Sequence, residues 1–542
     1  MKKLTMIGAC LALSAAAVAQ NLNPTVEVTN VYAREATGID KPSQLMALPD
    51  SVFHFNLDFD YSVRSTPYRG AYEFAPYRIQ LRPQPRPSTE GNLYVKAGAG
   101  FTLHPELSVV WTPLKKDILR LNLYADHASY IGRFKGISST NSRLGDNGSR
   151  YGGFQTRSLV GADALLAWTG GHFSADLSYK NIGASLSEND RAFHNFFQAK
   201  ARIGSHPGAG FVYDAGTHVS LMGGLLQETH TRSDARIGMN FGLHRIGIGV
   251  DLETVSRSGN GSAGHAAFTP HYVFDWGRFN MDLGVKIAFL FRSDPALYPH
   301  KGGVVFPDVR VSVTLLQDAL TAYASATGGN RFQVYSDLLE SNPFLPAFSN
   351  PAGGGMDNSV ERVDAALGLR GNIADRFHYD LKGGFAWWQN AMLYGFLWNS
   401  PVVGYADNLN KFYVDASFGW KADYLDLDAR ILLQRPRPSY HEDNRYLNYL
   451  FRPASFSGHL KALYKWGERF RGGVILDARS ASASVSDTLP GYFDLGLYAG
   501  FQLTARLGVW LRGGNLLGQT IQYVPGYAQQ GPWVSAGVIF TR

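Results

Sequence analysis

The feature that most constrains this chain is a two-residue hydrophobic alternation that persists over long segments. In the segment 281–292, one face carries Met281, Leu283, Val285, Ile287, Phe289 and Phe291, and the other carries Asp282, Lys286 and Arg292. The same alternation occurs in 118–131, 308–315 and 425–434. Because successive side chains of a strand point to opposite faces, each segment predicts a β-strand with one apolar and one polar face.

The length of these strands distinguishes a membrane barrel from a soluble sandwich. Sandwich strands average about five or six residues, whereas these runs last about 10–15, enough for a tilted strand to cross a bilayer. The apolar face would then meet lipid and the polar face a wet lumen. Only a closed barrel satisfies every backbone hydrogen bond in that setting. We therefore predict an all-β fold, a transmembrane antiparallel β-barrel.

The connections between strands alternate between short and long. Short turns are expected at 114–117, 169–172, 205–209, 243–245, 276–279, 316–319, 372–376, 422–424, 466–468 and 504–506. Longer connections are expected at 134–153, 187–193, 293–303, 330–357, 391–408, 437–453 and 519–531, with others near 101–103, 229–232, 258–262 and 485–490. Outer-membrane barrels show this asymmetry, with short periplasmic turns and longer outside loops, and the count predicts about 22 strands. Boundary errors leave 20 or 24 strands open.

The N-terminus reads as a targeting segment. Lys2 and Lys3 precede an apolar stretch that runs from Leu4 to Leu13, and Ala17-Val18-Ala19 fits a small-residue cleavage site. Residues 1–19 are therefore expected to be a cleaved signal peptide. Cys10, the single cysteine, faintly resembles a lipoprotein box, but the apolar stretch before it is too short. An exported mature chain without cysteine is consistent with an oxidising compartment.

The segment 20–91 differs from the rest of the chain, 92–542, which we assign to the barrel. It contains eight prolines and lacks sustained alternation, which favours an extended, Pro-rich tether. It is also rich in aromatic residues such as Phe53, Phe55 and Phe59, which disordered linkers usually lack. We therefore expect a short N-terminal periplasmic or lumenal extension, part of which packs against the barrel.

Several motifs that could carry chemistry have simpler explanations. Gly259 to Gly264 fits a dinucleotide fingerprint, but membrane-type strands flank it and a loop explains it better. His441-Glu442-Asp443 could supply metal ligands, yet no second cluster lies at a useful spacing. The sequence Asn147-Gly148-Ser149 is a formal glycosylation site that a loop turn also explains, and Trp387-Trp388 fits an interfacial aromatic girdle better than a sugar-stacking platform.

The overall charge and the histidine distribution exclude further classes. The net charge is +7, but the basic residues form no stripe, which argues against nucleic acid as a partner. The 15 histidines are spread along the chain and cannot be paired into a catalytic site. We expect no enzyme activity, no cofactor and no metal centre.

Two stretches of the sequence resemble the TonB-dependent receptors, large barrels that import scarce nutrients across the outer membrane. In 323–371, a strand and Asn330-Arg331-Phe332 lead to Asn342-Pro343-Phe344-Leu345-Pro346 and a returning strand, similar to the family's outside loop with its Asn-Pro-x-Leu motif. The C-terminus, with Gly514-Asn515-Leu516-Leu517-Gly518, Tyr523 to Tyr527 and a final strand 532–541, resembles the family's last hairpin.

The resemblance implies that this chain shares the barrel of the family. The N-terminal segment is the part in which it differs from the family. Family receptors carry a globular plug of well over a hundred residues, for which 20–91 is too short. Val26-Glu27-Val28-Thr29 resembles the short extended box that TonB grasps by strand addition. The expected partners are outer-membrane lipids, and TonB or another periplasmic or surface protein.

Two hypotheses of function follow from the sequence. The first is an outer-membrane barrel of a Gram-negative-type bacterium that takes part in the passage of a solute or ligand; the sequence identifies no solute. The second is a structural or scaffold barrel with an obstructed lumen that recruits partners for a multi-protein complex or for membrane-protein assembly. Because a barrel this wide would leak if it stood open, either 20–91 and the loops or a partner must close it.

Overall fold

The computed structural model describes residues 92–116, 118–206, 209–258, 261–292, 302–349, 356–440, 448–467 and 469–542. The expected signal peptide (1–19), the N-terminal extension (20–91) and the box at Val26–Thr29 lie outside the described residues. Among the described residues, 22 long antiparallel strands form one closed barrel. The prediction of an all-β barrel of about 22 strands is confirmed.

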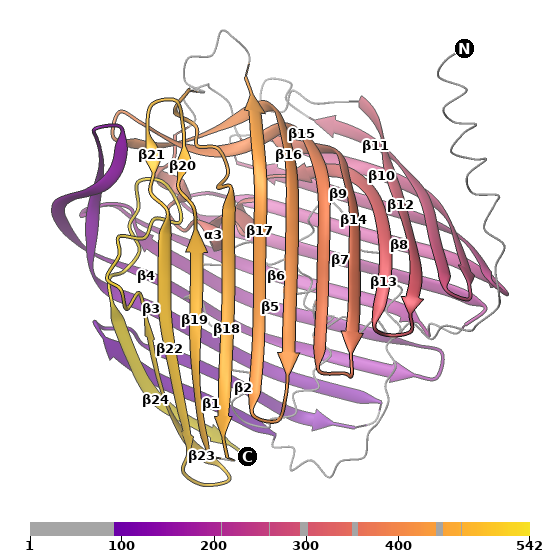
Figure 1. Ribbon diagram of the computed structural model, residues 1–542, viewed down its shortest axis with the longest axis horizontal. Coiled ribbons are helices and arrows are strands. Elements are labelled where there is room, and N and C mark those ends of the chain that lie inside the picture. Colours follow the sequence, from indigo (N-terminus) through magenta and orange to yellow (C-terminus); the bar gives the residue numbers. More distant parts are fainter. Residues whose placement is uncertain are drawn as a thin grey trace.

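The first half of the barrel contains strands β1 (Leu93–Phe101), β2 (Glu106–Lys115), β3 (Leu119–Thr140), β4 (Arg143–Trp168), β5 (Gly171–Ser185), β6 (Arg191–Ser205), β7 (Phe211–Gly224), β8 (Glu228–Phe241), β9 (His244–Arg257), β10 (Gly261–Trp276) and β11 (Phe279–Arg292). The second half contains β12 (Gly302–Leu316), β13 (Leu320–Phe332), β14 (Asn358–Ile373), β15 (Phe377–Leu397), β16 (Ser400–Lys421), β17 (Leu425–Ser439), β18 (Phe456–Trp466), β19 (Phe470–Arg479), β22 (Tyr492–Gln502), β23 (Leu507–Gly514) and β24 (Trp533–Thr541). Each strand pairs with its neighbours in the sequence, as Figure 1 shows.

The first and last strands close the barrel. β1 pairs with β24 in antiparallel register, with Val95 opposite Phe540 and Gly98 opposite Gly537. A Cβ atom at Gly537 would lie 2.0 Å from the carbonyl oxygen of Ala97, so only glycine permits this close approach of the two backbones. This closure leaves no free edge strand in the described barrel wall, as a lipid environment requires.

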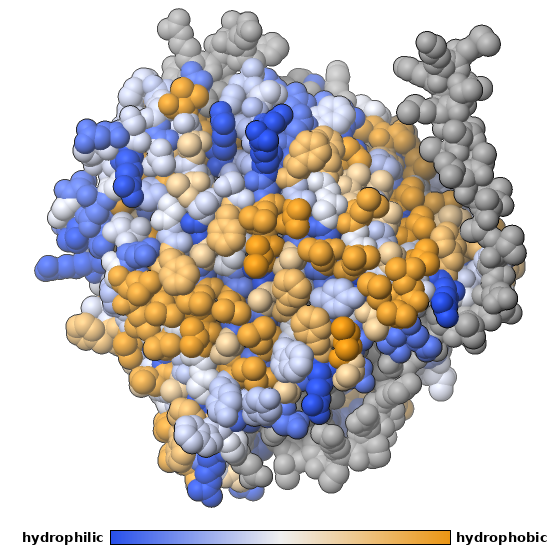
Figure 2. Space-filling model, in the orientation of Figure 1, coloured by the Kyte–Doolittle hydropathy of each residue, from blue (hydrophilic) through white to orange (hydrophobic). Residues whose placement is uncertain are grey.

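The two faces of the wall have the chemistry that the alternation predicts. In β9, the outward residues Ile246, Ile248, Val250 and Leu252 are exposed large apolar side chains, whereas Asp251 and Glu253 face the lumen and are buried. Figure 2 shows the outward residues as an apolar belt with hydrophilic regions above and below it. No helix in the described part of the chain is long and apolar enough to cross a membrane.

Three of the expected connections differ from the structure. Residues 134–153 and 391–408 form mainly extensions of β3–β4 and β15–β16, which end in tight turns at 141–142 and 398–399. Residues 229–232 lie inside β8, and the connection before that strand is 225–227. Residues 134–153 and 229–232 lack a run of apolar residues on the outward face, and 391–397 is apolar on both faces, so hydrophobic alternation could not identify these strands.

The short elements of the structure lie in the longer connections. These are helix α3 (Tyr335–Ser341), the 3₁₀ turn η2 (Leu345–Ala347), and the two-residue strands β20 (Ser482–Ala483) and β21 (Thr488–Leu489). The largest apolar cluster of buried residues joins α3 and η2 to lumen-facing side chains of β5, β6 and β7. The structure therefore concentrates its apolar core at the mouth of the barrel that carries the longer connections, where the site described next is located.

Candidate functional site

The loop that connects β13 to β14 folds into the barrel mouth. Its helix α3 and turn η2 place Leu339 and Leu345 in the largest apolar cluster, where they meet Ile182, Phe196 and Met222 of the barrel wall. Leu339 is completely buried and Phe344 is 1% exposed. Burial of several large side chains at about 1.5–3 kcal/mol each holds this loop inside the mouth.

A buried ion pair fixes the start of this loop to the wall. Nε of Arg257 on β9 lies 2.8 Å from Oε2 of Glu228 on β8, and both side chains are almost fully buried. The same carboxylate accepts hydrogen bonds from the backbone N–H groups of Tyr335 and Ser336, in the first turn of α3. Glu228 therefore satisfies helix N–H groups that have no partner within the helix.

Arg257 contacts both ends of the same loop. Its Nη1 donates to the carbonyl oxygen of Met356 at 2.9 Å, its Nη2 donates to the carbonyl oxygen of Gln333, and its guanidinium lies 4.6 Å from the ring centroid of Tyr335. A guanidinium has five N–H donors in a rigid plane, and here they connect two loop ends and one wall strand. Breaking such a buried pair typically costs 3–5 kcal/mol.

The connection between β23 and β24 forms a second inward loop, organised around a buried asparagine. Nδ2 of Asn515 donates to the carbonyl oxygens of Gln519 and Gln530, and its Oδ1 accepts from the backbone N–H of Gln519. The backbone N–H of Asn515 donates to Oδ1 of Asp494 on β22 at 2.8 Å. These bonds hold the loop 515–532 in a compact form against the wall.

The two inward loops contact each other through stacked aromatic rings. Phe344 and Tyr527 lie nearly parallel, with ring centroids 4.2 Å apart, and form one apolar cluster with Ala184 and Val524. The Asn-Pro-Phe-Leu-Pro stretch and the C-terminal stretch, which carry the sequence resemblance, are thus brought together in the mouth.

Extended hairpins cover the same mouth above the two inward loops. Leu144 of the β3–β4 hairpin is fully buried against Phe396, Phe451 and Leu489. Nζ of Lys135 donates to Oγ1 of Thr520 at 2.7 Å, which joins this hairpin to the second inward loop. The mouth is therefore packed at two levels, by loops inside the lumen and by hairpins above it.

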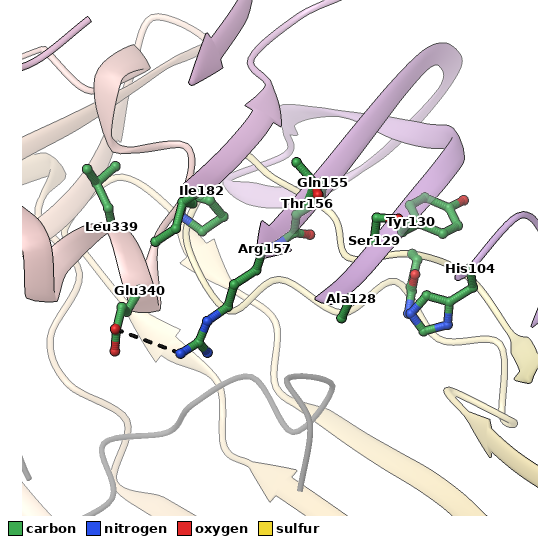
Figure 3. Close-up of a pocket in the computed structure, with 12 residues that line it drawn as sticks. His104, Ala128, Ser129, Tyr130, Gln155, Thr156, Arg157, Ile182, Leu339 and Glu340 are labelled. Carbon is green, nitrogen blue, oxygen red and sulfur yellow. Dashed lines mark ion pairs between the residues drawn. The ribbon is translucent and has the colours of Figure 1, made fainter. Parts of the chain in front are cut away.

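A small pocket lies between the first loop and the wall (Figure 3). It is lined by His104, Ala128, Ser129, Tyr130, Gln155, Thr156, Arg157, Ile182, Leu339, Glu340, Pro343 and Gln530. Glu340 of α3 forms ion pairs with Lys180 and with Arg157, the latter at 3.8 Å between Nη2 and Oε1. The cavity volume of about 40 Å³ holds about three water molecules.

Two titratable groups of the connections have shifted pKa values. Burial raises the pKa of Asp357 to about 6, although hydrogen bonds from the backbone of Asn358 and the side chain of Asn390 oppose the shift. Burial also lowers the pKa of His104, whose Nδ1 lies 3.1 Å from Oγ of Ser535. Asp357 is the last residue before β14, so its charge affects the returning end of the inward loop.

The remaining residues singled out in the sequence do not converge on this site. Gly261 to Gly264 lie in β10, Gly259 and Asn260 are outside the described residues, and so is His441-Glu442-Asp443. Asn147-Gly148-Ser149 lies in the exposed end of the β3–β4 hairpin. Trp387 faces outward, as expected for a girdle, but its neighbour Trp388 packs in a buried cluster because successive strand residues alternate. In the described residues, no group of three or more His, Cys, Asp or Glu side chains is arranged to hold a metal ion.

Comparison with known proteins identifies structural relatives but no sequence relatives. No protein-family model matches the chain, and no curated protein matches it in sequence. The FrpB iron transporter from Neisseria meningitidis superimposes with a TM-score of 0.60 at 8% identity, over 83% of this chain and 82% of the other. The siderophore receptor PiuA from Acinetobacter baumannii gives a TM-score of 0.59 at 7% identity, over 83% and 81%. The ferric-catecholate import receptor Fiu from E. coli K12 gives 0.58 at 9% identity, over 84% and 82%. This chain therefore has the 22-strand barrel fold of the TonB-dependent outer-membrane receptors.

Proposed function

We propose that this protein takes part in the passage of a solute or ligand across the outer membrane through a mouth that the inward loops close. The observation that carries the proposal is the stack of Phe344 on Tyr527, which joins the two inward loops within a barrel of receptor fold. The structural relatives include an iron transporter and siderophore receptors, which favours uptake of a scarce nutrient. Because the stacked rings of Phe344 and Tyr527 hold the two inward loops together, passage requires these loops to separate.

The N-terminal segment completes the proposed closure from the other side. Residues 1–19 would direct export, 20–91 would form a short lumenal or periplasmic closure, and 92–542 would form the barrel. A segment of this length with no cysteine to form a disulfide is marginal as an independent globular plug. Val26-Glu27-Val28-Thr29 would be the segment that TonB grasps if the passage is energised, by adding a strand to its sheet.

A scaffold barrel is the second candidate function, and the two-level packing of the mouth favours it. The contacts among the inward loops and the hairpins above them suit a barrel whose surface, rather than its lumen, is used. In that case, the covered mouth would present its hairpins to partner proteins.

Purification from native membranes tests both functions. After mild detergent extraction, mass spectrometry would identify small molecules and proteins that co-purify with the full-length chain. A solute in near-equal amount that dissociates from a Phe344→Ala, Tyr527→Ala variant supports passage. A stoichiometric partner protein, with no solute and no conductance in any loop variant, rejects passage in favour of the scaffold.

A further inference from the structure

Two arginines of β17 lie on the lipid-facing side of the barrel. In the last half of this strand, the exposed positions are Ile431, Leu433, Arg435, Arg437 and Ser439, and the intervening residues are less exposed. Side chains two residues apart share a face of a strand. Arg435 and Arg437 therefore continue the row of lipid-facing residues beyond Leu433, toward the end of the barrel that carries the longer connections.

The neighbours of these arginines are typical of a membrane–water interface. Arg435 lies opposite Phe412, which is 61% exposed, and Arg437 lies opposite Asn410. On the next strand, Trp387 lies opposite Asn410 and donates its indole N–H to Oδ1 of Asn408 at 3.0 Å. Tryptophan and tyrosine gather where lipid headgroups meet the apolar core. In Figure 2, strongly hydrophilic side chains stand above the apolar belt over the upper part of β16 and β17.

Neither arginine has a partner among the residues that the structure describes, whereas a nearby lumenal arginine does. Arg430, on the other face of β17, forms two hydrogen bonds with Asp415, at 3.0 and 2.8 Å. Arg435 and Arg437 make no hydrogen bond, ion pair or ring contact with a described residue. Their guanidinium groups are on one face of the strand, two residues apart, so they repel each other unless an anion lies between them.

We propose that Arg435 and Arg437, with Trp387 beside them, bind the phosphorylated headgroup of a lipid in the outer leaflet. Guanidinium groups match phosphate oxygens in planar, two-bond geometry. The acyl chains would then cover the apolar surface of Phe412 beside Arg435 and of Leu433 and Ile431 below it. The position of the two arginines on the wall fits this ligand. A basic side chain on the lipid face destabilises a barrel at the bilayer midplane but has almost no effect on its stability at the interface. This inference depends on the orientation of the barrel and not on passage through its lumen.

Lipid titration of the full-length protein tests this site. Native mass spectrometry in detergent would follow the binding of bisphosphorylated lipid A to the wild type and to an Arg435→Gln, Arg437→Gln variant. Each basic residue near a lipid surface changes binding about five-fold, so the double variant should bind at least ten-fold more weakly. An Arg435→Lys, Arg437→Lys variant should recover part of the loss, because the charge remains but the planar donor geometry does not.

Matched controls separate this site from general electrostatics and from misfolding. Arg506→Gln changes an exposed arginine of the opposite, short-turn end and should bind lipid A like the wild type. All variants should migrate as folded barrels in unboiled gels. The proposal is overturned if the double glutamine variant binds as well as the wild type, if lipid A lacking both phosphates binds equally, or if millimolar inorganic phosphate displaces the lipid completely.

Discussion

The ring of Phe344 lies parallel to that of Tyr527, with 4.2 Å between the centroids and 4° between the planes. Phe344 belongs to the loop between β13 and β14, and Tyr527 to the loop between β23 and β24. Their contact joins two loops that are far apart in the sequence and meet inside the mouth. A parallel pair of this kind adds about 0.5–1.5 kcal/mol beyond the burial of its apolar surface.

Loss of this stack should loosen the mouth without unfolding the barrel. Phe344→Ala removes a side chain that is 1% exposed, and such core truncations cost about 3–5 kcal/mol. The substitution should destabilise the loops and not the barrel wall, because the strand hydrogen bonds that hold the wall do not involve this side chain. In a chain that lacks residues 20–91, the substitution should make cells more sensitive to large antibiotics than the deletion alone does. Phe289→Ala in the same background, which changes an exposed outward side chain, should leave sensitivity unchanged; equal sensitisation by both variants would mean that the stack has no special role.

Glu228→Gln should release the first inward loop. The substitution leaves the guanidinium of Arg257 buried without a counter-charge, at a cost of about 3–5 kcal/mol. Hydrogen exchange of the backbone amides in 333–349 should accelerate, because Tyr335 and Ser336 donate to this carboxylate. Asp214→Asn removes the partner of Arg202 in a pair that is more than one-third exposed, so it should cost about 0–1 kcal/mol and leave exchange in 333–349 unchanged. Exchange in 333–349 that is as slow in the Glu228→Gln variant as in the wild type would contradict the anchoring role of Glu228.

The returning end of the same loop should weaken as the pH rises through about 6. The folded pKa of Asp357 is raised to about 6, above the value of an exposed aspartate, so the folded state holds its proton more tightly than the unfolded state. Its contribution to stability is therefore fully present below pH 4 and is lost as the pH rises through 6, by up to roughly 3 kcal/mol. Exchange at Asn358 and its neighbours, corrected for intrinsic rates, should be faster at pH 7.5 than at pH 5. Asp357→Asn should abolish that difference, and a variant that retains it would assign the effect to another group.

Cysteine labelling should establish the orientation of the barrel. The single natural cysteine is Cys10, within the expected signal peptide, so introduced cysteines would be the reactive ones. Ser149→Cys, in the exposed end of the β3–β4 hairpin, should react with a membrane-impermeant maleimide on intact cells. Ala505→Cys, in the short turn 503–506, should react only after the outer membrane is permeabilised. The reverse pattern would invert the topology and place Arg435 and Arg437 on the periplasmic side.

The fold could be predicted closely from the sequence because each strand that crosses lipid must alternate apolar outward and polar lumenal side chains. The turn at 422–424 coincides with the connection between β16 and β17, and the strand predicted at 532–541 is β24, Trp533–Thr541. Where strands extend beyond the membrane, the outward side chains do not have to be apolar. Hairpin β3–β4 extends to Thr140 and Arg143 through pairing between its own arms, without an apolar outward face. The prediction of a loop there was wrong for that reason.

The candidate site was only partly predictable. The sequence singled out both Asn342-Pro343-Phe344 and the C-terminal stretch through Tyr527, but nothing in either indicates that they touch. Their contact depends on the closure of the whole barrel, which brings β24 beside β1. The Glu228–Arg257 pair gave no sequence signal, because alternating charged residues on lumen-facing positions are common to the whole wall.

Conductance in planar bilayers tests the central claim, that the packed inward loops close the barrel mouth. The informative pair is a chain that lacks residues 20–91 but keeps the signal, with and without Phe344→Ala and Tyr527→Ala. The deletion alone should still insert and conduct ions in small steps, and the added substitutions should enlarge those steps several-fold. Equal conductance of the two proteins, with both folded as barrels in unboiled gels, would contradict closure by the loops.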